Sequence, residues 1–420
     1  MGAHFLRAGN MGLTAVCLIA PGMLFIRCGW VPLVARLLLL FATGTWVHVS
    51  IDLARVRIAM GEPWIRMAAI LGGVALFTLL SSLTFHTRSM KRWYYFEMNS
   101  RVPSAVAFLL TAVSLGIVQL KVTPPMLLAE RFWPGGGWTE ILGLAVYAAW
   151  ITEKMLDARE SATWRRRVWL IFSVIFFSQL VLGLAGMDRF LMTGDFHLPV
   201  PALIVAGPIF RGYGFFMPIL FGVTLLLVGP AWCSHLCYIG ACDHAASLGS
   251  RRPKALPQWT RPARIAILVL VVVAAISLRL VGASVTVVGA TALGFGILGA
   301  IVMVAWSRRT GVMTHCSFFC PIGLIANVLG KLSPFRIHIE AGCNDCGKCG
   351  LVCRYDSLNK SDIESRRPGL TCTLCGDCIG KCKDNQIGYR LAGISGPHAR
   401  VVFIVLVVSI HAVFMGVARM

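Results

Sequence analysis

Long apolar stretches separated by short polar loops run through most of the chain. Some of them, such as 213–230 and 285–305, contain no Asp, Glu, Lys or Arg. An apolar helix of roughly 17–22 residues is long enough to cross a lipid bilayer. The pattern therefore predicts about ten membrane spans, which lie near 11–26, 31–50, 67–85, 103–120, 137–155, 168–186, 213–230, 263–281, 285–305 and 400–418.

The composition indicates a membrane protein built mainly of α-helices. Hydrophobic residues make up 57% of the 420 residues and charged residues only 14%, whereas a soluble domain carries about 25% charged residues. The net charge is +21, but the basic residues lie in loops beside the spans. There they indicate orientation and contact with membrane lipid, and we expect no nucleic-acid partner.

The basic loops also predict which face of the membrane each loop occupies. Lys and Arg gather around 88–101, 154–167, 251–264 and 308–336. Alternation of the predicted spans puts these loops on one face, which the positive-inside rule makes cytoplasmic. The outer loop with Arg55, Arg57 and Arg66 is an exception to the rule.

One polar segment, 336–392, holds eight of the 15 cysteines. They read Cys343-x2-Cys346-x2-Cys349-x3-Cys353 and Cys372-x2-Cys375-x2-Cys378-x3-Cys382. This spacing is the one that bacterial ferredoxins use for [4Fe–4S] clusters, and in two-cluster ferredoxins the fourth cysteine of each run ligates the other cluster. The prediction is two clusters, one held by Cys343, Cys346, Cys349 and Cys382, the other by Cys372, Cys375, Cys378 and Cys353.

Two alternative uses of these cysteines fit the pattern less well. Zinc sites are usually built from C-x2-C pairs and lack the x3 step, and disulfides are rare on a reducing cytoplasmic face. Arg354 and Lys383 follow the fourth cysteines, where a proline is usual. A cation beside an anionic cluster is expected to favour its reduced state.

A second cysteine pattern occurs twice at the predicted ends of spans. The phrases are Cys233-Ser234-His235-Leu236-Cys237 and Cys316-Ser317-Phe318-Phe319-Cys320, followed by Ile239-Gly240 and Ile322-Gly323 at the same offset. Cysteines at i and i+4 would share one face of a helical turn. This predicts an internal duplication and an additional metal or cluster site at Cys233, Cys237, Cys316 and Cys320, with His235 and Cys242 as further candidate ligands. Packing of small buried cysteines at helix ends is the alternative.

The two phrases and the double-cluster segment together resemble the NapH- and NosR-type membrane ferredoxins. The resemblance covers about 168–392, with Tyr238 where the family has a proline and Pro321 at the matching place in the second phrase. It implies a bacterial inner-membrane protein, either a quinol dehydrogenase or an electron-transfer subunit. Such proteins pass electrons from quinol toward periplasmic nitrate or nitrous oxide reductases. CcoG-type oxidase assembly ferredoxins share much of the pattern and stay a competing family.

These features divide the chain into four predicted segments. They are an N-terminal transmembrane module (1–165), a NapH-like four-span core with both phrases (166–335), a cytoplasmic double-[4Fe–4S] ferredoxin-like domain (336–392) and a C-terminal transmembrane helix (393–420). The expected fold is thus a polytopic helical membrane protein with an inserted cluster domain.

Chemistry in the N-terminal module centres on ionisable residues at membrane depth, which are costly and often functional. His48, Asp52 and Arg55 fall on one helical face and could receive protons from quinol; a neutralised contact between helices is the alternative. His48 or His86 are candidate ligands for haem b. His197, in the loop 187–213, is a further quinol or proton candidate.

We therefore expect an iron–sulfur protein of a respiratory chain that passes electrons between the quinone pool and a partner. The partner would be another subunit of a respiratory complex or a periplasmic reductase or cytochrome. Two alternatives stay open: an assembly factor that reduces copper or a thiol, and a relay subunit whose neighbour binds quinone. Clusters on the cytoplasmic face need a further carrier to move an electron about 30 Å across the membrane, which keeps haem b or a third cluster in consideration.

Overall fold

The computed structural model describes residues 2–7, 9–26, 30–87, 90, 94, 101–191, 198–392 and 394–417. His197 lies outside these described residues. The chain divides into two compact units, Met1–Glu153 and Lys154–Met420. The cluster segment and the last helix both belong to the second unit, while the four-segment division stays a prediction.

Eight helices in the described part of the chain are long and apolar enough to cross a membrane. They are Val31–Ala59, Ile65–Leu83, Arg101–Lys121, Ser161–Leu184, Phe216–Leu236, Thr260–Leu280, Val285–Thr310 and Pro397–Val417. The transmembrane character is therefore supported, but the count of about ten is not. The predicted span 11–26 forms only a short helix and a 3₁₀ turn. The span near 137–155 is a helix of 21 residues that carries Glu140, Glu153 and Lys154 and is not among these eight.

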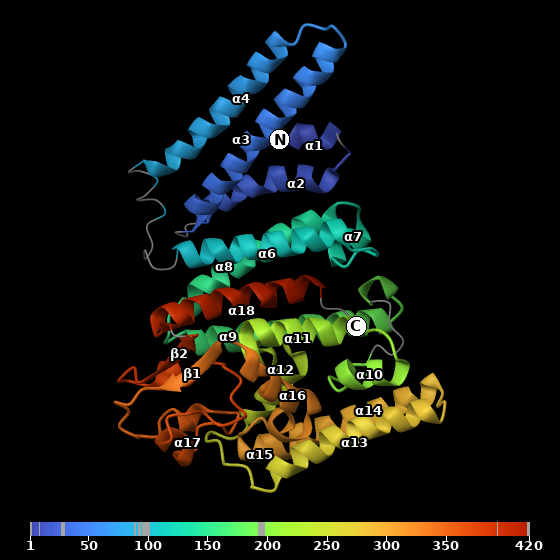
Figure 1. Ribbon diagram of the computed structural model, residues 1–420, viewed down its shortest axis with the longest axis vertical. Coiled ribbons are helices and arrows are strands. Elements are labelled where there is room, and N and C mark those ends of the chain that lie inside the picture. Colours follow the sequence, from blue (N-terminus) through green and yellow to red (C-terminus); the bar gives the residue numbers. More distant parts are fainter. Residues whose placement is uncertain are drawn as a thin grey trace. The chain divides into compact units, whose positions relative to one another are not determined.

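The first unit contains a long helical hairpin. Figure 1 shows α3 (Val31–Ala59) and α4 (Ile65–Leu83) side by side. The remaining elements of this unit are α1 (Gly2–Arg7), α2 (Met11–Ile19), η1 (Ala20–Phe25), η2 (Thr84–His86), α6 (Arg101–Lys121), α7 (Leu128–Phe132) and α8 (Gly136–Leu156), which ends just past the boundary. Trp30, Val34 and Phe108 lie in the core of this unit.

The second unit packs its helices around the two cysteine phrases. Helix α9 (Ser161–Leu184) contacts α12 (Tyr238–Ser247), and α13 (Thr260–Leu280) contacts α16 (Pro321–Leu329). Its other helices and turns are η3 (Asp188–Phe190), α10 (Leu203–Arg211), α11 (Phe216–Val228), η4 (Gly229–Ala231), η5 (Trp232–Leu236), α14 (Val285–Val302), η6 (Met303–Ser307), α15 (Arg308–Thr310), η7 (His315–Phe319), η8 (Gly330–Leu332), η9 (Gly350–Val352), α17 (Lys360–Glu364), η10 (Ile379–Lys381) and α18 (Pro397–Val417).

A small antiparallel sheet closes the cluster segment. Strand β1 (Phe335–Ile339) pairs with β2 (Ile387–Leu391), and β3 (Ile394–Ser395) extends the sheet from β2. Side chains alternate between buried and exposed along β1, as expected for a strand with one covered face. Helix α18 contacts β2, and the rings of Tyr389 and Phe403 stack with their centroids 4.4 Å apart. The apolar C-terminal helix therefore packs directly on the cluster segment (Figure 1).

Both cysteine phrases adopt the same backbone conformation. The π-helical turns η5 and η7 each contain the first cysteine, and Cys237 and Cys320 follow in an extended conformation as the N-caps of α12 and α16. The prediction that the two cysteines of a phrase share one helical face is therefore wrong, because the helix breaks between them. The duplication itself agrees with this local geometry.

The glycine three residues after each second cysteine lies against the first cysteine of its phrase. A Cβ on Gly240 would stand 2.7 Å from the carbonyl oxygen of Cys233, and a Cβ on Gly323 would overlap the carbonyl oxygen of Cys316. Only a residue without a side chain allows the chain to double back this closely.

We predict that Gly323→Ala destabilises the protein by about 1–3 kcal/mol, the usual cost of overpacking a close contact. Gly294→Ala is the control, because a Cβ there meets nothing within 4 Å. Thermal unfolding of both variants in detergent measures the difference. Equal midpoints would show that the close approach at Gly323 is not needed.

Candidate functional site

The two ferredoxin-type runs repeat one loop conformation. The third and fifth residues of each run have positive φ: Asp345 (55°) and Gly347 (71°) in the first, Leu374 (57°) and Gly376 (78°) in the second. Alternation of right- and left-handed residues turns successive backbone N–H groups toward one side, a concavity that binds anions and occurs at many iron–sulfur sites. The loops are therefore shaped for a negatively charged group.

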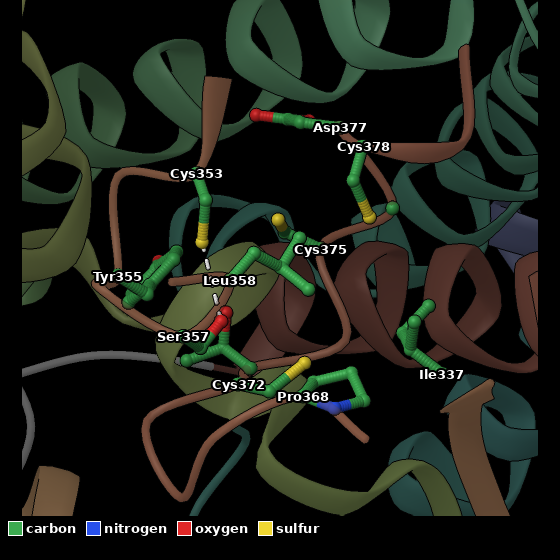
Figure 2. Close-up of a pocket in the computed structure, with 12 residues that line it drawn as sticks. Ile337, Cys353, Tyr355, Ser357, Leu358, Pro368, Cys372, Cys375, Asp377 and Cys378 are labelled. Atoms are coloured by element: carbon green, nitrogen blue, oxygen red, sulfur yellow. Dashed lines mark hydrogen bonds between the residues drawn. The ribbon is translucent and has the colours of Figure 1, made fainter. Parts of the chain in front are cut away.

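Four cysteines from both runs surround one small cavity. Cys372, Cys375 and Cys378 line it together with Cys353, the fourth cysteine of the other run. Figure 2 shows the four side chains around a common space, with Cys353 Sγ 3.2 Å from the Ser357 hydroxyl. This is the grouping that the crossover rule predicts, although the ligand assignment itself stays a prediction.

The chemistry of this donor set fits a metal cluster. Burial raises the pKa of Cys372 to about 12 and holds that of Cys378 well above its ordinary value. A bound metal would have to displace these protons, because thiolates are the metal ligands. Four thiols around one cavity, in loops of this conformation, suit a [4Fe–4S] cluster.

The other four ferredoxin-type cysteines lie in a more open environment. Cys346 is exposed and Cys343, Cys349 and Cys382 are half-buried. The neighbouring thiols of Cys343 and Cys346 contribute, after burial, to a raised pKa of Cys349. Asn344 donates a hydrogen bond of 3.1 Å to the Asp384 carboxylate, which brings the end of the second run beside the start of the first. This placement is compatible with a cluster bound by both runs.

A buried ion pair ties the second run to a membrane helix. Arg165 of α9 is 1% exposed, and its Nε and Nη2 donate to the two carboxylate oxygens of Asp377 at 3.0 and 2.6 Å. Its Nη1 donates to the carbonyl oxygen of Ser234, inside the first phrase, at 2.9 Å. One guanidinium therefore joins helix, phrase and cluster loop. No local sequence pattern marks this pair, because its members are 212 positions apart.

The segment after Cys353 adds further contacts to the phrases. The Tyr355 hydroxyl donates to the carbonyl oxygen of Cys233 at 3.2 Å. Arg354, expected from the sequence to act as a cation near a cluster, donates instead to the backbone carbonyls of Ser250 and Gly311 at 2.9 and 2.8 Å. Its observed role is thus to fasten the cluster segment to the loops beside it.

The four thiols of the two phrases meet in the core of the second unit. Cys233, Cys316 and Cys320 are buried and Cys237 is half-buried. Each thiol lies within electrostatic range of the other three. Within the described residues, no three His, Cys, Asp or Glu side chains converge closely enough to hold a single metal ion.

The first unit contains the candidate proton and haem ligands His48, Asp52 and His86. His48 Nδ1 lies 3.0 Å from Asp52 Oδ2, and the two side chains are 76% and 52% exposed. His86 ends the turn η2, but its side chain is outside the described residues, as is His197. The His48–Asp52 pair is therefore the only one of these candidates whose geometry the described residues establish.

The second unit contains two cavities that the sequence did not indicate. An open, apolar one of about 650 Å³ runs along α9, lined by Leu170, Val174, Phe177, Ser173 and Cys242 among others. A second, of about 510 Å³, has Cys372 in its wall and is rimmed by the basic side chains of Lys331, Arg336, Arg366, Arg367 and Arg390.

Comparison with known proteins places the phrases inside a recognised domain. A family model described as a 4Fe-4S binding domain matches residues 209–255 and 292–340. Each stretch contains one phrase, and the eight ferredoxin-type cysteines lie beyond both. The comparison with solved structures found no match.

Two curated proteins are similar to parts of the chain. One is the "Putative electron transport protein YccM" of Escherichia coli, 25% identical over 48% of this chain and 59% of that protein. The other is the "Ferredoxin-type protein NapH" of Haemophilus influenzae, 31% identical over 22% of this chain and 34% of that protein. The chain thus spans between a third and three-fifths of the length of these relatives. The predicted resemblance to NapH-type ferredoxins is confirmed, as is the iron–sulfur, ferredoxin-type character; the CcoG-type alternative is not tested by these matches.

We predict that Asp377→Ala lowers the stability by about 3–5 kcal/mol, because it leaves the Arg165 guanidinium buried without its counter-charge. Asp345→Ala is the matched control, since Asp345 belongs to the other run and pairs with Arg366 at the exposed surface. Chemical unfolding of the purified variants measures both. A loss in Asp377→Ala no larger than in the control would contradict a structural role for the buried pair.

Proposed function

We propose that the protein is a membrane-bound iron–sulfur electron carrier that links the quinone pool to a partner oxidoreductase. The observation that most supports this proposal is the cavity lined by Cys353, Cys372, Cys375 and Cys378. These cysteines would hold one [4Fe–4S] cluster, and Cys343, Cys346, Cys349 and Cys382 the second. A cluster, when bound, takes up and releases one electron at a time, so two clusters accept the two electrons of one quinol.

The apolar groove along α9 suits the ring and tail of a quinol. Its wall is formed by apolar residues of a membrane helix, as expected where a lipid-soluble molecule enters from the bilayer. The Ser173 hydroxyl lies in the same wall, donates to the carbonyl oxygen of Tyr238 at 3.0 Å and lies 3.6 Å from the Cys242 thiol. Helix α9 also carries Arg165, so the groove and the cluster loop share one element.

The basic groove beside Cys372 suits the docking of an acidic partner. A lysine from η8 and arginines from β1, β2 and the loop before the second run line it. A positive surface steers an oppositely charged protein to the place where an electron can leave. By the positive-inside rule this side of the membrane is the cytoplasmic one, in a bacterial inner membrane.

A quinol analogue tests the proposed function directly. Added anaerobically to the purified full-length protein, it should bleach the visible absorbance of the oxidised clusters, releasing two protons for each pair of electrons transferred. Reduction by dithionite but not by quinol would favour a relay subunit whose neighbour binds quinone. Dependence of the turnover on copper would favour an assembly factor.

We predict that Val174→Trp slows this quinol-driven reduction by about tenfold, the effect of roughly 1.4 kcal/mol of lost binding, because it fills the groove. Ile171→Trp is the control, since this residue is exposed on the same helix but does not line the groove. Stopped-flow absorbance with quinol and with dithionite measures both. Equal rates for the two variants would place the quinol site elsewhere.

A further inference from the structure

Strand β1 forms one edge of the small sheet in the cluster segment. The strand order is β1-β2-β3, so no strand of the described residues pairs with the other side of β1. Glu340, directly after β1, donates its N–H to the carbonyl oxygen of Gln386 at 2.8 Å. Hydrogen-bonded residues alternate with non-hydrogen-bonded ones along an antiparallel pair. In the register of β1 and β2, the N–H and carbonyl groups of Ile337 and Ile339 therefore point away from β2.

Ile337 holds unpaired backbone groups although it is buried. The residue is 7% exposed, and neither its N–H nor its carbonyl oxygen has a hydrogen-bond partner among the described residues. Buried backbone groups are almost always paired, either with protein or with water. Phe335, two residues earlier, has its N–H bonded to the Ser333 hydroxyl at 3.3 Å. The edge at Ile337 therefore offers one donor and one acceptor to a further strand.

The unpaired edge borders the basic groove beside Cys372. Residues 335–338 of β1 and residues 366–370 of the loop before the second run both line this cavity of about 510 Å³, a volume in the range of ligand pockets. Asn327 of α16 is 5% exposed and also lines the groove, and its Oδ1 has no hydrogen-bond partner among the described residues. A buried amide oxygen without a donor is unfavourable. A backbone N–H group of a bound peptide would supply that donor.

The charges around the groove are positive and poorly balanced. Arg336 and Arg390 stand directly opposite each other on β1 and β2, and like charges at opposite positions destabilise a sheet. Of the lysine and arginine side chains that line the groove, only Arg366 forms a salt bridge within the described part of the chain, with Asp345. No Asp or Glu is among the residues that line the groove. An acidic ligand would offset this repulsion.

We propose that the groove binds an extended acidic segment of a partner protein, which adds as a strand to the free edge of β1. Main-chain hydrogen bonds give such a segment its affinity, and alternate side chains give it specificity. Side chains along β1 alternate between buried and exposed, with Arg336 on the exposed side and Ile337 on the buried side. A neighbouring strand follows the same alternation. The expected segment therefore alternates acidic residues, beside Arg336 and Arg390, with apolar residues beside Ile337.

A strand in this groove would bring the partner next to the ferredoxin-type cysteines. Cys372 lines both the basic groove and the cavity that it shares with Cys353, Cys375 and Cys378. Ile337, at the unpaired edge, lines the same two cavities. Strand addition would therefore fix the partner beside the place where an electron is proposed to leave. The redox role of the partner rests on the proposed function, whereas binding of the acidic segment does not.

Binding of a labelled peptide to the purified full-length protein in detergent tests the site. The probe is a fluorescein-labelled peptide of about six residues, the usual length of a strand, in which glutamate and valine alternate. Fluorescence anisotropy gives its affinity, which should fall as salt is added. Arg367→Gln and Arg390→Gln should each weaken binding about threefold, the effect of losing an exposed ion pair. Arg261→Gln, an exposed arginine outside the groove, should leave the affinity unchanged.

Methylation of the peptide backbone separates strand addition from attraction by charge alone. Two further peptides keep the same side chains and carry N-methyl groups on alternate amides, one on the odd positions and the other on the even positions. Only the peptide whose methyl groups face β1 should lose binding, by about tenfold or more, because each methyl group removes a hydrogen bond. Equal affinity of all three peptides would show binding by charge alone and would overturn the proposal.

Two other results would also overturn the proposal. One is no binding of the unmethylated peptide up to about 1 mM. The other is concentration-dependent dimerisation in place of peptide binding, which would assign the edge of β1 to a second copy of the chain. Peptide binding by a protein whose clusters quinol does not reduce would leave the strand site standing and remove the proposed function. Quinol reduction without peptide binding would remove the strand site alone.

Discussion

The buried contact of Arg165 with Asp377 ties the second cysteine run to a membrane helix, and the arrangement of the second unit depends on it. A charge that is 1% exposed is tolerable only while its partner stays in place. The partner lies between two cysteines of the second run, and the remaining guanidinium nitrogen is bound inside the first phrase. Movement of the cluster loop away from α9 would therefore leave the buried Arg165 guanidinium without its counter-charge. This fixes the loop against helix α9.

The duplication gives helices α12 and α16 the same local start. Each phrase interrupts a helix with a π turn, extends at its second cysteine and restarts as a new helix capped by that cysteine. A glycine at the same offset in each copy lets the chain fold back onto the first cysteine. Two copies related by this repeat bury Cys233, Cys316 and Cys320 inside the second unit. The matched 4Fe-4S binding domain covers both copies, so the phrases are part of that domain.

The sequence could group the cysteines of the two runs because ligand spacing within a loop is a local property, and their assignment as cluster ligands stays a prediction. The positive φ values at equivalent positions of both runs and the meeting of Cys353 with Cys372, Cys375 and Cys378 agree with it. The prediction for the phrases was wrong in its local geometry, because a regular helix was assumed through Cys233 and Cys237. The predicted spans near 11–26 and 137–155 are not among the eight helices of the described residues that are long and apolar enough to cross a membrane.

The sequence by itself determined the membrane character, the mainly helical class and the ferredoxin-type runs, because hydropathy and ligand spacing are read over a few neighbouring residues. Only the tertiary structure decided which distant charges meet. Asp377 finds Arg165 across 212 positions, and Arg264 comes to lie beside thiols from both phrases. These contacts depend on how α9, α13 and the two repeats pack, and the pairing of buried charges by packing has no signature in local sequence.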